Sequence, residues 1–280
     1  MQANHFRKER VLLINRLTVY SQGAKLNVLE FRGKKDQDIL LLHGLAGCGM
    51  EWESTADWLI KFGRVLAPDQ RGHGTSQFNV TDFSRHAYVE DAIQIIEKCC
   101  DKPVVLIGQS MGGLNAFLLT AKRPDLVKAL IVVEATPEQN STAQEDIRNW
   151  LNHWPVPFKN LGDAIEYFGG DTLYGRTFAK SLVKREDGYW PVFKYENMIH
   201  SLDDVVDKHY WNDWQQIICP TLIVAGEKGS ISKDILTRMV SAIPDGRYIY
   251  VPNAGHDLHL DNPQAWRKTV EDFFKDQGLS

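Results

Sequence analysis

The feature that most constrains the fold is a series of short, wholly apolar segments, each followed by a stretch with helical periodicity. The segments are Ile39–Leu42, Val65–Ala67, Val104–Ile107, Leu130–Val133 and Leu222–Ala225. Strands that do not alternate apolar with polar residues are buried on both faces, as in a parallel sheet that is covered by helices. The sequence therefore predicts an α/β fold with its functional site at the carboxyl ends of the strands.

Two further features lie outside this series. An antiparallel pair of strands is expected ahead of it, over 11–20 and 25–32. The alternation of strands and helices then stops between about 135 and 216, a stretch that holds five of the eight tryptophans. We interpret 135–216 as a mostly helical cap inserted after the sixth core strand, and 1–134 with 217–280 as the core domain.

Composition and charge exclude several classes of protein. The longest apolar runs have four or five residues, whereas a membrane-spanning helix needs about 20. A net charge of −4 gives no broad cationic face for nucleic acid or anionic lipid. The basic residues near the amino terminus are followed too soon by Asn15 and Arg16 to form a signal-peptide core. Four cysteines without paired spacing indicate free thiols, so we expect a cytoplasmic protein that acts on a small molecule as a monomer or homodimer.

One sequence motif by itself indicates a catalytic residue. Gly108-Gln109-Ser110-Met111-Gly112 has the pattern G-x-S-x-G and joins the strand 104–107 to an apolar-periodic helix over 114–121. A serine on such a tight turn projects its hydroxyl above the sheet, and small glycines on either side let the backbone pass closely. The helix that begins there favours a developing anion at its amino end. Ser110 is therefore a candidate nucleophile.

Two loops could complete this site. The strand 39–42 runs into His43-Gly44, and the free N–H groups of that loop could point at a substrate oxyanion. Near the carboxyl terminus, His256 follows the last strand on a loop. A histidine in that context is a candidate base for Ser110.

With these motifs and the run Ala67–Ser76, nearly the whole chain resembles the α/β-hydrolases, specifically the large capped, single-chain group. The resemblance implies an α/β-hydrolase fold, with a mostly parallel sheet flanked by helices, and catalysis without metal or cofactor. It also implies that Ser110 attacks a carbonyl, that His256 takes its proton, and that the N–H groups of Leu45 and Met111 hold the oxyanion.

The third member of the implied triad departs from the common pattern of the family. Members usually carry an aspartate shortly after the strand that follows the cap, but Gly229 occupies that position here. Some relatives, including haloalkane dehalogenases and certain lactone hydrolases, use an acid at the end of the preceding core strand, which corresponds to Glu134. Glu227 is the alternative, and a site without an acid is the third possibility.

The resemblance indicates the type of reaction but leaves the substrate open. We predict a carboxylic ester hydrolase of the esterase or lactonase type, acting on a small to medium apolar compound. C–C bond hydrolysis, acyl transfer, or a slow-turnover ligand-binding or signalling role with the same residues are the alternatives. Haloalkane dehalogenases and epoxide hydrolases are excluded because their chemistry needs a carboxylate where this chain has Ser110.

Overall fold

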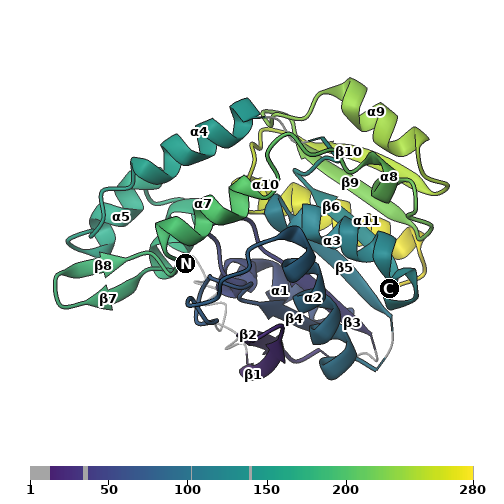
Figure 1. The fold of residues 1–280 in the computed structure, drawn as a ribbon. Helices are drawn as coiled ribbons and strands as arrows, with labels where there is room; N and C mark the ends of the chain where they lie inside the picture. The colour runs from purple at the N-terminus through teal and green to yellow at the C-terminus, as the bar shows by residue number, and fades with distance from the viewer. Residues whose placement is uncertain (1–12, 34–36, 102, 139–140, 280) are drawn as a thin grey trace, which may run out of the picture.

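The computed structural model describes residues 13–33, 37–101, 103–138 and 141–279. Within these residues, eight strands form one sheet in the order β1-β2-β4-β3-β5-β6-β9-β10 (Figure 1). The first strands are antiparallel to their neighbours, and all pairs from β4 to β10 are parallel. The predicted mostly parallel sheet is thus confirmed. The strands are β1 (Ile14–Ser21), β2 (Ala24–Phe31), β3 (Asp38–Leu42), β4 (Arg64–Pro68), β5 (Val104–Gln109), β6 (Val127–Val133), β9 (Thr221–Gly226) and β10 (Gly246–Val251).

The start of the first predicted strand, at residues 11 and 12, and the basic amino-terminal residues lie outside the described residues. In the described part of the chain, no helix is both long enough and apolar enough to cross a membrane.

Helices cover both faces of the sheet, which explains why its central strands are apolar throughout. In β5, Val104 and Leu106 face one apolar cluster, whereas Val105 and Ile107 face another. The first cluster is completed by α2 (Arg85–Cys99), α3 (Met111–Lys122), α8 (Trp211–Trp214) and α9 (Lys233–Ser241). The second is completed by the 3₁₀ helix η1 (Gly49–Trp52), α1 (Glu53–Leu59), α10 (Leu258–Asp261) and α11 (Pro263–Asp276).

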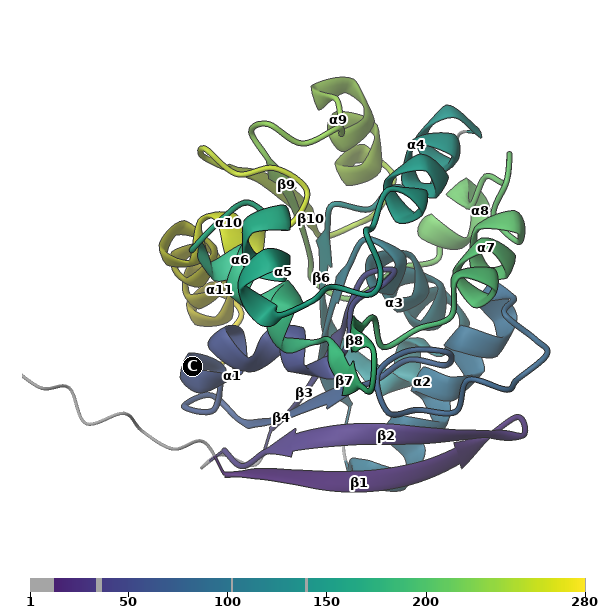
Figure 2. The ribbon, with the colours of Figure 1, turned by 90° about the vertical axis from the view of Figure 1, so that its left-hand side faces the viewer.

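The segment between β6 and β9 builds a separate layer beyond the carboxyl ends of the strands (Figures 1 and 2). It contains α4 (Ser141–Asn152), α5 (Leu161–Tyr167), α6 (Leu173–Lys180), the hairpin β7 (Val183–Arg185) and β8 (Gly188–Trp190), and α7 (Tyr195–Asp203). We refer to 135–216 as the cap, and the domain boundaries themselves stay a prediction. The cap has its own aromatic cluster, formed by Trp154, Phe158, Phe168 and Phe178 among others.

The last helix of this segment packs with the core. Trp214 on α8 is fully buried, its Nε1 donates to the carbonyl of Met239 at 2.8 Å, and its ring lies edge-on to Phe117 of α3. The cap is therefore fixed to the core at its carboxyl end by a large apolar side chain.

Candidate active site

Ser110 stands on a sharp turn between β5 and α3. Its backbone has φ 53° and ψ −119°, a conformation that non-glycine residues rarely adopt. Glycine is required beside it, because a Cβ on Gly112 would lie 2.2 Å from the carbonyl oxygen of Leu42. The Ser110 N–H donates to the carbonyl of Val133 on β6 at 2.8 Å, which ties the turn to the neighbouring strand.

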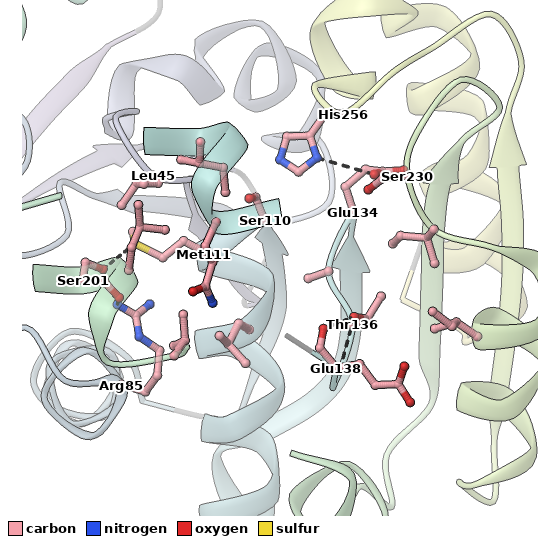
Figure 3. A pocket seen from close by; sticks show the side chains of 18 of the residues that line it. Leu45, Arg85, Ser110, Met111, Glu134, Thr136, Glu138, Ser201, Ser230 and His256 are labelled. Atoms are coloured by element: carbon pink, nitrogen blue, oxygen red, sulfur yellow. Dashed lines mark hydrogen bonds and ion pairs between the residues drawn. The ribbon is translucent and has the colours of Figure 1, made fainter. Parts of the chain in front are cut away.

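Glu134 follows β6 directly, and its side chain is completely buried. Its backbone also has a positive φ, 48°, and its N–H donates to the carbonyl of Val224 at 3.0 Å. One carboxylate oxygen, Oε1, accepts from the N–H of Gly226 at 2.6 Å. The other, Oε2, lies 3.5 Å from Nδ1 of His256, as the dashed line in Figure 3 shows. Of the two carboxylates considered from the sequence, Glu134 is the one beside the histidine.

Glu227 has a different setting. It is exposed, and its Oε2 accepts from the N–H of Asn253 at 2.9 Å, which braces the loops after β9 and β10 against each other. Gly229 lies against the other candidate acid, since a Cβ built on it would be 2.3 Å from Oε1 of Glu134. The Glu134 carboxylate thus fills the space that a side chain at position 229 would need.

His256 lies on the loop between β10 and α10, and 51 % of its side chain is exposed, on the side of the cavity. Figure 3 shows the Ser110 hydroxyl directed toward the His256 ring, with Glu134 on the other side of the ring. Desolvation lowers the pKa of His256, but the hydrogen bond that His256 donates to Glu134 and the charges of Asp257 and Glu134 together raise it above its ordinary value. Burial also raises the pKa of Asp257, to about 6.

The proposed oxyanion donors lie at the mouth of the same turn. Within the described residues, the N–H groups of Leu45 and Met111 donate to no protein acceptor, and both residues line the cavity at Ser110. The neighbouring Ala46 has φ 65°, and its N–H donates to Nε2 of His73 at 3.2 Å. The hydrogen bond of Ala46 therefore holds the loop while the N–H of Leu45 stays available to a ligand in the cavity.

Two buried histidines brace this loop. Burial lowers the pKa of both His43 and His73, so both are neutral near pH 7. Each accepts a backbone N–H at Nε2, His43 from Gln70 at 3.0 Å and His73 from Ala46. Within the described residues, no group of three or more His, Cys, Asp or Glu side chains is arranged to hold a metal ion.

The cavity above Ser110 has two lobes, which meet at Leu45, Ser110 and His256. The first, of about 320 Å³, is called the Arg85 lobe here, and its lining includes Arg85 and Gln144 among aliphatic side chains. The second, of about 300 Å³, is called the Trp150 lobe. It is lined by three aromatic residues and three acids: Trp150, Tyr174, Phe178, Glu51, Asp146 and Asp257.

The sequence analysis did not single out Arg85 or Gln144. One signal was available for the arginine, because Ser84 caps α2 and Arg85 is the first residue of that helix. A cation there opposes the helix dipole, so an arginine at that position needs another reason to be present. Gln144 gave no comparable signal.

The comparisons with known proteins identify the family of the chain. A sequence model described as the alpha/beta hydrolase family matches residues 39–269. The chain belongs to the alpha/beta hydrolase family.

Curated relatives are distant but match most of the chain. The chain is 25 % identical over 243 residues to 2-(acetamidomethylene)succinate hydrolase of Mesorhizobium japonicum, covering 84 % of this chain and 87 % of the relative. It is 24 % identical over 264 residues to a putative 2-succinyl-6-hydroxy-2,4-cyclohexadiene-1-carboxylate synthase of Bacillus subtilis, covering 90 % and 96 %.

Solved structures share the fold. A crystal structure of E-2-(acetamidomethylene)succinate hydrolase superposes with a TM-score of 0.86 at 23 % identity, over 94 % of this chain and 100 % of that one. The enol-lactonase of Burkholderia xenovorans gives a TM-score of 0.73 at 17 % identity, over 92 % and 100 %. The predicted fold class is confirmed, and at these identities the likeness extends to the fold alone.

Proposed function

We propose that the protein is a serine hydrolase that cleaves a carboxylic ester or lactone through an acyl-enzyme on Ser110. Membership of the family supports hydrolysis in general. The observation that carries the proposal is the line from the Ser110 turn through His256 to the buried Glu134 carboxylate, 3.5 Å from the histidine. A serine hydroxyl is a poor nucleophile at neutral pH, and this order of groups is the one that activates it.

In the proposed reaction, Oγ of Ser110 attacks the substrate carbonyl while Nε2 of His256 takes the hydroxyl proton. The carbonyl oxygen becomes an oxyanion that accepts from the N–H groups of Leu45 and Met111. Collapse of the tetrahedral intermediate breaks the bond to the alcohol, which leaves with the proton from His256. Water then attacks the acyl-enzyme by the same steps and regenerates Ser110.

Glu134 acts on the histidine in this scheme. A carboxylate at Nδ1 fixes the tautomer that leaves Nε2 free, and it stabilises the imidazolium that forms in the transition state. Because the backbone N–H of Gly226 holds Oε1, Oε2 is the oxygen available to His256. The loss of one oxyanion donor, by comparison, is expected to cost about 10²–10³ in rate.

The test has two arms. A fluorophosphonate is expected to add once, at Ser110, as read by peptide mass spectrometry, and p-nitrophenyl esters and lactones are expected to be turned over. Ser110→Ala is the matched control and should lose both properties. Folded wild-type protein that takes no label and turns over no member of the panel would refute the proposal, as would labelling at another residue.

We extend the proposal to the setting in which the protein works. The four cysteines, Cys48, Cys99, Cys100 and Cys219, are free thiols, which supports a reducing compartment such as the cytoplasm. The two lobes are of a size for a small-molecule substrate, and no nucleic acid or membrane partner is part of the proposal.

A further inference from the structure

Arg85 is a buried cation that, among the residues the structure describes, has no carboxylate in hydrogen-bonding range. The residue is 5 % exposed. Its ion-pair partner, Asp204, has Oδ2 at 3.9 Å from Nε, and within the described residues that Nε has no hydrogen-bond acceptor. The remaining contacts of the guanidinium are neutral: Nη1 donates to Oδ1 of Asn115 at 3.1 Å, Nη2 donates to Ser201 and Phe83, and the ring of Tyr88 lies 4.3 Å away.

The charge of Asp204 is shared among several donors. Its Oδ2 accepts from the backbone N–H of Arg85 at 2.7 Å, and its Oδ1 lies 2.9 Å from Nζ of Lys208. Two cationic side chains therefore share one carboxylate, and the surplus positive charge is on the buried partner. Burial accordingly lowers the pKa of Arg85.

Arg71, another buried arginine of the core, shows what full pairing looks like. It is 1 % exposed, and its Nε and Nη2 each donate to a different oxygen of Asp91 at 2.7 Å. Buried charges are normally paired in this way, because leaving one without a counter-ion costs several kcal/mol. Arg85 lacks such a partner and lines the cavity at Ser110, so its partner is expected to come from the cavity.

Gln144 gives an independent indication in the same lobe. It is 3 % exposed, and within the described residues neither its Oε1 nor its Nε2 has a hydrogen-bond partner. A buried amide with both ends unpaired is destabilising because it has lost its hydrogen bonds to water, and such groups are rare in native proteins. A ligand in the Arg85 lobe that accepts a hydrogen bond would remove part of that cost.

The acidic groups near the cavity favour one end for an anion. The Trp150 lobe presents Glu51, Asp146 and Asp257, which would repel a negative group. The Arg85 lobe is lined by Glu134, which lies 3.5 Å from His256, and by Glu138, which is paired with Nη1 of Arg238 at 2.6 Å. Figure 3 shows Arg85 and Ser201 together at the end of the cavity away from His256 and Glu134.

We propose that the Arg85 lobe binds a free carboxylate of the substrate, so that the ester or lactone cleaved at Ser110 is that of an acid or alcohol with a second, ionised carboxyl group. The inference rests on the proposed hydrolase function. It refines the expected apolar compound to one that is apolar in its middle and anionic at one end. Arg85 supplies charge-assisted donors and Gln144 a neutral donor, in a lobe whose other walls mix aliphatic and polar side chains.

The kinetic test uses three matched esters: neutral phenyl butyrate, monophenyl succinate with the carboxylate on the acyl side, and 3-(butyryloxy)benzoate with it on the alcohol side. We expect one of the two charged esters to exceed the neutral ester about 10–100-fold in kcat/KM, the range for a hydrogen-bonded charge. Arg85→Met and Gln144→Leu should each reduce the ratio of kcat/KM for the charged ester to that for the neutral ester by about fivefold or more. Gln144 has no protein partner to lose, so its variant is expected to fold even if the arginine variant does not.

Two controls and a binding measurement separate the possible results. Arg267→Met and Gln264→Leu, on the exposed face of α11, should keep the wild-type ratio. Binding of all three esters to Ser110→Ala is measured by calorimetry, and one of the two charged esters should bind more tightly than phenyl butyrate. If wild-type protein hydrolyses no ester but Ser110→Ala still binds a charged ester more tightly, the hydrolase proposal fails and the carboxylate site stands. If the neutral ester is preferred, or the ratio is unchanged in both lobe variants, the carboxylate site is overturned.

Discussion

Three residues at the site, Ala46, Ser110 and Glu134, hold a backbone conformation with positive φ although none is a glycine. Each such residue costs about 1–3 kcal/mol unless its surroundings enforce the conformation. Here the enforcing contacts are hydrogen bonds, from Ser110 N–H to Val133, from Glu134 N–H to Val224 and from Ala46 N–H to His73. The strain therefore coincides with the oxyanion loop, the proposed nucleophile and the proposed acid.

The first prediction concerns Glu134→Gln. Loss of the carboxylate should lower kcat by on the order of 10²–10⁴, since the comparable change in a serine protease triad costs about 10⁴. In the wild type, kcat/KM should fall at acidic pH with an apparent pKa above the ordinary histidine value of about 6.5. The reason is that the pKa of His256 is raised and only its neutral form acts as base; we call this fall the acid limb of the profile. In the variant the limb should move to lower pH.

The measurement is a pH profile of kcat/KM on one activated ester. Glu227→Gln is the matched control, because that carboxylate braces a loop and lies outside both lobes, and it should keep both the rate and the limb. Full activity in Glu134→Gln together with loss in Glu227→Gln would assign the acid to the other glutamate.

A second prediction follows from the contact between Gly229 and Glu134. Gly229→Ala should lower kcat by about tenfold or more, because the new Cβ would lie 2.3 Å from Oε1 and displace the carboxylate. Glu134→Gly suits the positive φ at that position and empties the space. Adding Gly229→Asp to Glu134→Gly should then recover part of the lost kcat. The same Gly229→Asp change in the wild-type background should not raise kcat. Equal kcat in the single and double variants would refute this exchange of positions.

At the scale of secondary structure, the sequence predicted the antiparallel pair β1–β2 and the central strands with two buried faces. β3, β5, β6 and β9 are apolar runs in the sequence because helices cover both faces of the sheet. The turn at Ser110 could be predicted because its steric need for glycines produces the G-x-S-x-G pattern. The hairpin β7–β8 was not foreseen, since its strands have three residues each and no fully buried position. Arg85 and Gln144 meet in one lobe only through tertiary packing of α2 and α4, which local sequence does not encode.

A third prediction compares two buried tryptophans of the 135–216 segment, Trp214 and Trp154. Trp214→Ala removes a fully buried ring from the cluster beside the sheet and should cost about 3–5 kcal/mol of global stability. Trp154→Ala removes a ring from the aromatic cluster of the cap. It should therefore lower kcat/KM clearly and shift the urea midpoint of global unfolding only slightly. Urea denaturation followed by circular dichroism, with ester hydrolysis alongside, checks both. Equal losses of global stability would show that cap and core unfold as one unit.

For the whole molecule, the described apolar residues form two large clusters against the sheet and three smaller ones, of which one is the aromatic cluster of the cap. Segments with their own small cluster tend to open at lower free energy than the core. The fourth prediction is that amides of α5 and α6 exchange hydrogen through openings of lower free energy than amides of β5 and β6. Native-state hydrogen exchange read by mass spectrometry measures both. Exchange of all four elements only by global unfolding would contradict it.

Ser110 and Glu134 follow the neighbouring strands β5 and β6, whereas His256 comes much later in the chain. This order determines when during biosynthesis Ser110 can become reactive. A chain emerges from the ribosome amino end first, so the serine and the glutamate leave it well before the histidine. Until the loop after β10 is made, the nascent chain carries the proposed nucleophile without its proposed base and should not react with esters. His256→Ala removes the proposed base alone, and this variant should retain its sheet by circular dichroism while remaining inert to a fluorophosphonate.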